Sequence, residues 1–131
     1  MRLAVVGSRS LRPDIAPHIP SGVTEIVTGG AEGADAAAMA YARAWELRLT
    51  VHRPDYKLLG RQAPLARNQL IVDGADSLLA FWDGESRGTL HTIAYALDRG
   101  KPCRVIRMTP MHRVPRPSEE DCLPWQLREF R

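Results

Sequence analysis

The feature that most constrains this chain is the recurrence of short apolar stretches, each bounded by turn-forming residues. The stretches are rich in Val, Ile or Leu, which is typical of strands buried on both faces of a sheet. Segments with helical periodicity lie between them, and this alternation predicts βαβ units with right-handed crossovers. The predicted strands are Leu3–Val6, Glu25–Thr28, Leu49–His52, Ser77–Phe81 and Cys103–Met108.

Three of the intervening segments have the spacing of helices, and Asp14–Ile19 is predicted to form one short turn. The helix predicted for Thr89–Arg99 ends where Gly100 and Pro102 follow it, as helices commonly do. A weaker helix is predicted for Pro64–Asp73, where Pro64 suits the first turn. The expected apolar faces are Ala38, Tyr41 and Trp45 in a helix over Ala34–Leu47, Leu65, Ala66 and Leu70 in the weaker helix, and Leu90, Ile93, Ala94 and Leu97 in the last one.

These elements predict an α/β fold, a Rossmann-like three-layer sandwich. A mostly parallel five-stranded sheet of order about 3-2-1-4-5 would carry helices on both faces. The length of 131 residues suits one core, and we expect residues 1–108 to form this domain. Residues 109–131 change in composition and read as a proline-rich arm that ends in a short docking segment, with Leu123, Trp125, Leu127 and Phe130 as its apolar residues.

The composition is that of an ordinary globular protein, with 44% hydrophobic and 25% charged residues. No apolar run approaches the roughly 20 residues of a membrane span, and the first residues lack a signal-peptide pattern, so we expect a cytoplasmic protein without a membrane partner. Cys103 and Cys122 have no metal or redox spacing, and we predict no metal site and no cofactor. The net charge of +3 suits anionic ligands but is too small and scattered to indicate nucleic acid by itself.

Three glycine- or serine-rich segments follow predicted strands: "GSRS" at 7–10, "GGAEGAD" at 29–35 and "WDGESRGT" at 82–89. In an open parallel sheet, ligands bind at the carboxyl ends of the strands, where the strand order reverses. Glycine lets backbone N–H groups approach a ligand, and the N-terminus of a helix attracts phosphate. The three segments therefore predict one rim that binds a nucleotide or a ribose phosphate, although any one of them alone would read as a tight turn.

The predicted ligand-binding residues belong to these segments or to the helix after the third strand. Arg67 is the residue expected to grip phosphate in a bidentate manner, free of the core, and Arg9 and Arg87 are its companions. The segment 55–66 is a predicted lid. The predicted ligand-binding residues are Gly7, Ser8, Arg9, Gly29, Gly30, Gly33, Asp35, Arg67, Asn68, Asp83, Gly84, Ser86, Arg87, Gly88 and Thr89, and the lid contacts are Asp55, Tyr56 and Arg61.

Simpler interpretations of the individual side chains stay open. The arginines could be solvated, and Asp35 could only offset the dipole of its helix. Glu32 and Glu85 are expected to face solvent rather than ribose hydroxyls. His91 reads more as a surface histidine than as a base.

Together, "VGSRS", "TGGAEGADAAAMAYA" and the stretch from "RPDYKLLG" to "DRGKP" resemble the SLOG superfamily, in particular its YspA-like branch. The resemblance covers roughly residues 1–108. It implies a Rossmann-like fold and a role in binding nucleotides or nucleotide-derived molecules such as ADP-ribose or NAD derivatives. It also leaves a homo-oligomer open, because relatives often pair through helices that flank the site.

Two better-characterised groups in that superfamily give alternatives. The LOG phosphoribohydrolases cleave the N-glycosidic bond of nucleoside monophosphates with an Arg and a Glu; Arg67 matches the Arg, but Thr92 stands where the Glu would be. Thr cannot stabilise an oxocarbenium-like ribose or activate water, so no catalytic residue is assigned and an enzyme is not the leading interpretation. The DNA-processing protein DprA has a segment similar to "TGGAEGADAAAM", with His at the position of Met39.

Three functions therefore remain open. The leading one is binding or sensing of a nucleotide-derived small molecule. The second is hydrolysis of an N-glycoside in a nucleoside monophosphate or ADP-ribose. The third is binding of single-stranded nucleic acid, favoured by the pI of about 9.2 together with the segment that resembles DprA.

Overall fold

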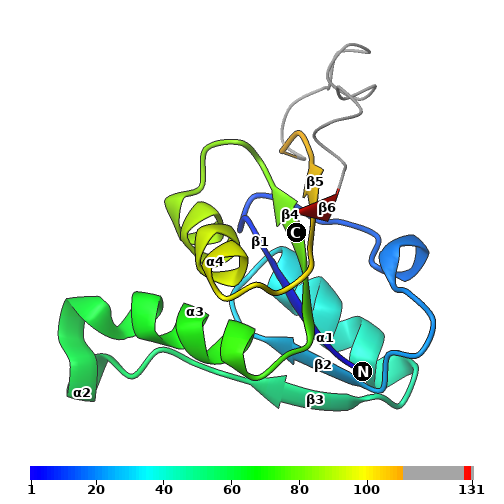
Figure 1. Ribbon diagram of the computed structural model, residues 1–131, viewed down its shortest axis with the longest axis horizontal. Coiled ribbons are helices and arrows are strands. Elements are labelled where there is room, and N and C mark those ends of the chain that lie inside the picture. The colour runs from blue at the N-terminus through cyan, green and yellow to red at the C-terminus, as the bar shows by residue number, and fades with distance from the viewer. Residues whose placement is uncertain (111–128, 131) are drawn as a thin grey trace.

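The protein folds as the α/β sandwich that the alternation predicts. The computed structural model describes residues 1–110 and 129–130 (Figure 1). Five parallel strands are arranged in the order β3-β2-β1-β4-β5, which confirms the predicted Rossmann-like sheet. The strands are β1 (Arg2–Gly7), β2 (Glu25–Thr28), β3 (Arg48–Val51), β4 (Ser77–Trp82) and β5 (Cys103–Arg107).

A sixth strand extends this sheet beyond the prediction. β6 (Glu129–Phe130) pairs with β5 in an antiparallel manner, with Phe130 opposite Cys103 and Glu129 opposite Arg104. The proline-rich arm predicted for residues 109–131 otherwise lies almost wholly outside the described residues.

Helices cover both faces of the sheet. On one face α1 (Ala34–Ala44) packs together with the segment that follows β1, which includes the 3-10 helix η1 (Ala16–His18). On the other face lie α3 (Ala63–Asp73) and α4 (Arg87–Asp98), in contact with each other. The short helix α2 (Tyr56–Leu59) and the 3-10 helix η2 (Gly60–Gln62) lead into α3.

Each face has its own apolar core, because successive strand residues point to opposite sides. In β1, Ala4 and Val6 pack on the α3–α4 side, whereas Leu3 and Val5 pack on the α1 side. β4 alternates in the same way. The outer strand β3 is only partly buried, so the prediction of burial on both faces is wrong for this edge.

The predicted helix faces are wrong in detail. In α4 the buried residues are Thr89, Thr92, Ile93 and Ala96, which is the predicted set moved by one position, and Leu90 is 48% exposed. One position turns a helix by about 100°. The Thr residues tolerate burial because their hydroxyl groups bond within the first turns of the helix: Thr92 Oγ1 donates to the carbonyl of Gly88 at 2.9 Å, and Thr89 Oγ1 pairs with Ser86 Oγ at 3.1 Å.

The other two helices differ similarly. In α3 the buried residues are Ala63, Asn68, Ile71 and Val72, while Leu70 of the predicted face is 54% exposed. α1 ends at Ala44 rather than Leu47, so Trp45 lies at its C-cap and is 65% exposed. Small residues face the sheet in α1 because they let the helix approach the strands closely.

Candidate functional site

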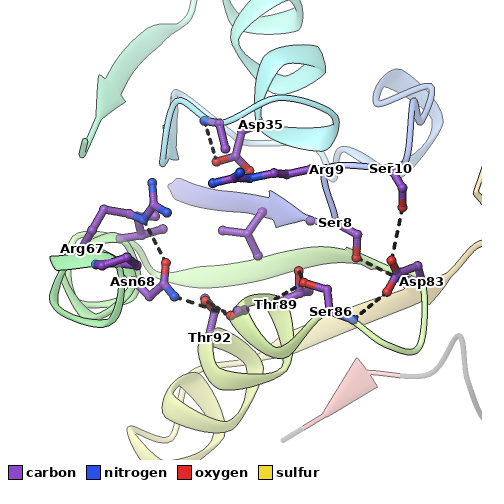
Figure 2. A pocket seen from close by; sticks show the side chains of 16 residues that line it. Ser8, Arg9, Ser10, Asp35, Arg67, Asn68, Asp83, Ser86, Thr89 and Thr92 are labelled. Carbon is purple, nitrogen blue, oxygen red and sulfur yellow. Dashed lines mark hydrogen bonds between the residues drawn. The ribbon is translucent and has the colours of Figure 1, made fainter. Parts of the chain in front are cut away.

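A cavity of about 460 Å³ opens at the carboxyl edge of the sheet, between the loops that follow β1 and β4. The strand order reverses between these two strands, which is where open α/β sheets bind ligands. α1 contributes to it from one face of the sheet, and α3 and α4 from the other (Figure 2). The volume lies within the range of about 300–1,000 Å³ that is usual for small-molecule sites.

Most of the predicted ligand-binding residues line this cavity. The predicted residues that do so are Gly7, Ser8, Arg9, Asp35, Arg67, Asn68, Asp83, Ser86, Gly88 and Thr89. Those that do not are Gly29, Gly30, Gly33, Gly84 and Arg87, together with the lid residues Asp55, Tyr56 and Arg61. The cavity thus gathers side chains from four predicted segments, but not every glycine among them.

The loop between β2 and α1 is organised around Asp35. Its Oδ2 accepts hydrogen bonds from the backbone N–H groups of Gly29 at 3.1 Å and Ala31 at 3.2 Å. The side chain is only 5% exposed. Burial raises the pKa of Asp35, and the two amides, the charge of Arg67 and the Thr28 hydroxyl oppose this only in part. Asp35 therefore serves as a buried acceptor for the loop itself.

The glycines of this loop make room for other parts of the protein. At Gly33, with φ of 76°, an added Cβ would lie 2.6 Å from the carbonyl oxygen of Ser8 and 2.7 Å from that of Arg9. At Gly29 it would lie 2.7 Å from Nη1 of Arg67. The absence of side chains here lets the loops after β1 and β2 and the Arg67 side chain approach each other.

The loop between β4 and α4 is organised by a second carboxylate. Oδ1 of Asp83 accepts the N–H groups of Glu85 and Ser86, both at 2.8 Å, and Oδ2 accepts the hydroxyl of Ser10 at 3.2 Å. Partial burial acts to raise the pKa of Asp83, but these hydrogen bonds and that of Ser8 outweigh it, so the pKa is lowered. Ser86 then caps α4 by accepting the N–H of Thr89 at 3.3 Å.

Arg67 and Asn68 bridge the two sides of the cavity. Nη1 of Arg67 donates to the carbonyl of Gly29 at 2.8 Å, and its Nε donates to Oδ1 of Asn68 at 2.9 Å. Nδ2 of Asn68 in turn donates to the carbonyl of Gly88 at 3.5 Å, a weak contact. Arg67, which was predicted to be free of the core, is thus tied to the loop after β2 and to Asn68.

Electrostatics around Arg67 are mixed. Burial lowers its pKa, Asp35 and Tyr56 raise it, and Arg9 lowers it. Tyr56 does not line the cavity. Of the other predicted lid residues, Asp55 caps α2 by accepting the N–H of Leu58 at 3.1 Å, and Arg61 is exposed.

Four side chains of or near these loops that were not assigned to the ligand have defined environments. Trp82 packs against the core and donates from Nε1 to the carbonyl of Ser86 at 3.0 Å, so it supports the loop from below. Glu32 and Glu85 are exposed, and neither lines the cavity. His91 is also outside the cavity lining, and its enclosed Nδ1 has no hydrogen-bond partner among the described residues.

Sequence reasoning missed some residues of the cavity. Ser10 was quoted in the first loop but not assigned a role, and Thr92 was considered only as a missing carboxylate. The remaining ones are apolar: Val6, Ala31, Pro64 and Ile71. Ser10 could have been found by its place next to Ser8 and Arg9, whereas nothing in the local pattern distinguishes the apolar residues from core.

Gly88 lines the cavity at a position where an added side chain would not collide with the protein. It lies in the first turn of α4, and a Cβ added there would meet nothing within 4 Å. Within the described part of the chain, no group of three or more His, Cys, Asp or Glu residues could hold a metal ion. None of the helices described is long and apolar enough to cross a membrane.

Comparisons with known proteins give one relative and no description of function. No protein-family model and no solved structure matches the chain. The chain is similar to the Gene 61 protein of Mycobacterium phage D29, with 38% identity over 85 residues. The match covers 59% of this chain and 66% of the phage protein, just under two thirds of it. A phage protein thus has a related sequence, and its name states no activity.

Proposed function

We propose that the cavity binds a phosphate-bearing, nucleotide-derived small molecule, such as a nucleotide or a derivative of ADP-ribose or NAD. The observation that carries this proposal is the presence of Arg9 and Arg67 on one cavity, at the point where the strand order reverses. The planar guanidinium group of arginine matches the geometry of phosphate oxygens and can bind two of them at once. The resemblance of the glycine-rich segments to the SLOG superfamily supports the same ligand class.

The charges around the cavity also favour an anion. Its two carboxylates, Asp35 and Asp83, each accept at least two backbone N–H groups. By contrast, the guanidinium of Arg9 has no hydrogen bond or ion pair with any described residue. The carboxylates of the cavity thus have hydrogen-bond partners within the protein, whereas the guanidinium group of Arg9 is available to a ligand.

A thermal-shift screen tests the proposal. The purified protein is heated with AMP, ADP, NAD, ADP-ribose and cyclic dinucleotides, and adenosine serves as the control that lacks phosphate. A ligand present at 100 times its Kd should stabilise the protein by about 2.7 kcal/mol. If none of the phosphate compounds shifts the melting temperature more than adenosine does, the proposal is wrong.

A second candidate is hydrolysis of the N-glycosidic bond in such a ligand, and one observation favours it. Thr92 leaves the expected position without a carboxylate, but Asp35 supplies one from the opposite side of the same cavity. Burial raises the pKa of Asp35 above its ordinary value, which favours proton uptake by this carboxylate. Chromatography of AMP and ADP-ribose incubated with the protein would detect the freed base, and the release should be lost in Asp35→Asn. Absence of free base supports a binding role alone.

A further inference from the structure

We propose that the anionic group of the ligand binds between the guanidinium groups of Arg9 and Arg67, and in neither of the two glycine-rich loops. This inference rests on the proposed function and deepens it, since it assigns the place of the phosphoryl group. It differs from the sequence-based prediction, in which the loops at 29–35 and 84–89 hold the phosphate.

Both loops already hold an anion of the protein. In the loop after β2, the carboxylate of Asp35 occupies the N–H groups of Gly29 and Ala31. In the loop after β4, the carboxylate of Asp83 occupies those of Glu85 and Ser86. A phosphoryl group on either loop would have to compete with a carboxylate for these N–H groups, which are already satisfied.

The glycines of the first loop are closed to a ligand for a steric reason as well. The space beside Gly29 is taken by Arg67 and Asp35, that beside Gly30 by Arg53 and Val51, and that beside Gly33 by backbone atoms of the loop after β1. None of these three glycines lines the cavity. The close approach that glycine allows is therefore used within the protein.

Arg9 and Arg67, unlike the two loops, offer positive charge that faces the cavity. They come from opposite sides of the cavity, Arg9 from the loop after β1 and Arg67 from α3, and Figure 2 shows their side chains reaching toward the same end of it. Burial lowers the pKa of Arg67, and the charge of Arg9 lowers it further, as expected for two guanidinium groups near each other. An anion between two guanidinium groups attracts both of them and offsets their mutual repulsion, so its binding there is favourable.

Both side chains also have donors to spare. Among the described residues, Arg67 uses Nη1 for Gly29 and Nε for Asn68, which leaves Nη2 without a recorded acceptor. The Arg9 side chain bonds to none of the residues that the structure describes, and it lines the cavity. The nearby Asp35 offsets one positive charge, but its Oδ2 is engaged by the loop amides. A phosphoryl group with two or more unesterified oxygens would match the remaining donors of both arginines.

Titration calorimetry with AMP, ADP-ribose and inorganic phosphate as probes tests this inference, using the full chain and two variants. Arg9→Ala is the decisive variant, because the Arg9 side chain has no hydrogen bond or ion pair with any described residue, and its main-chain bond to Arg12 is kept in the variant. Arg87→Ala is the matched control, since this arginine is exposed in the first turn of α4 and does not line the cavity. The same melting temperature for all three proteins establishes that they are folded.

We expect Arg9→Ala to weaken the binding of the phosphate probe that the wild type binds by about tenfold to a hundredfold, and Arg87→Ala by less than about twofold, as for an exposed charge. Arg9→Lys should restore only part of the affinity, because an ammonium group lacks the planar fork of Arg. Equal affinities of the wild type and Arg9→Ala would overturn the inference, as would an equal loss in Arg87→Ala, which would return the phosphoryl group to the loop after β4. If the wild type itself binds none of the probes, the proposed function fails first.

Discussion

The two loops that flank the cavity, 29–35 after β2 and 83–89 after β4, have the same residue types in different physical roles. Each contains glycines and one aspartate that accepts two backbone N–H groups. In the first loop the aspartate is buried and its pKa is raised, and the glycines pack against protein atoms. In the second the aspartate is partly exposed and its pKa is lowered, and Gly88 faces open space. The first loop is thus built for packing, and the second leaves room for a ligand.

The largest expected effect concerns the packed loop. Gly33→Val should lower the free energy of unfolding by about 2–5 kcal/mol, because valine tolerates the positive φ poorly and its Cβ would collide with the loop after β1. Chemical denaturation measures this. Gly22→Val is the matched control, since Gly22 has a similar φ of 87° but nothing within 4 Å of an added Cβ. Equal losses in the two variants would mean that packing in this loop contributes little.

The second effect concerns the aspartate of the open loop. Asp83→Ala should cost about 1–3 kcal/mol at neutral pH, because two amide groups and a hydroxyl lose their acceptor. The folded-state pKa of Asp83 lies below the ordinary value of 3.8, so its stabilisation is present above that pH and is lost as the pH falls through the folded-state pKa. Denaturation at several pH values should show the wild type and the variant converge in acid, and a constant difference would contradict the prediction.

A smaller effect is expected at Gly88, and it separates stability from binding. Gly88→Ala should leave the free energy of unfolding unchanged or raise it by up to about 1 kcal/mol, since the methyl group meets open space and alanine favours helix. The same methyl group should weaken the binding of any ligand that contacts the first turn of α4. Gln69→Ala, at an exposed position of α3 outside the cavity lining, should change neither quantity. A destabilised Gly88→Ala protein would show that this position is packed like Gly33.

The smallest effect on stability at any one pH is expected for Asp35→Asn. The stability contributed by Asp35 falls as the pH rises, whereas that contributed by Asp83 increases with pH. The folded-state pKa of Asp35 is raised, so the unfolded chain ionises first and stability falls as the pH rises from about 3.8 through the folded-state value. The variant lacks this decline. Its stability relative to the wild type should therefore improve as the pH rises through this window, as followed by thermal unfolding. A relative stability that worsens would indicate that Asp35 is stabilised as an anion.

Much of the architecture could be predicted because it depends on local patterns. The apolar stretches and the helical segments between them predicted the five parallel strands, their order and the edge on which the loops meet. The helix faces were wrong because Leu90 and Leu70 are apolar but exposed, and Thr92 and Asn68 are polar but buried. Hydrophobicity alone cannot identify a polar residue whose hydrogen bonds are satisfied by a neighbouring turn.

The partners of the site residues could be predicted less well. Arg67 and Asp35 are 32 positions apart in the numbering and belong to different helices, so no local pattern indicates that both bond to Gly29. The sequence likewise assigned every glycine of the three loops to a ligand, whereas Gly33 accommodates the backbone of the loop after β1. Such contacts depend on how closely two loops approach in space.

The sequence by itself determined the class of fold and the edge of the sheet at which polar and glycine-rich loops gather, because strand and helix periodicity are properties of neighbouring residues. Only the tertiary structure decided which groups at that edge are available to a ligand. It joined Asp35 and Asp83 to backbone amides, tied Arg67 to Gly29 and left Arg9 and Gly88 facing the cavity. The physical reason is that a hydrogen-bonding group is open to a ligand only when no partner from a distant part of the chain already satisfies it.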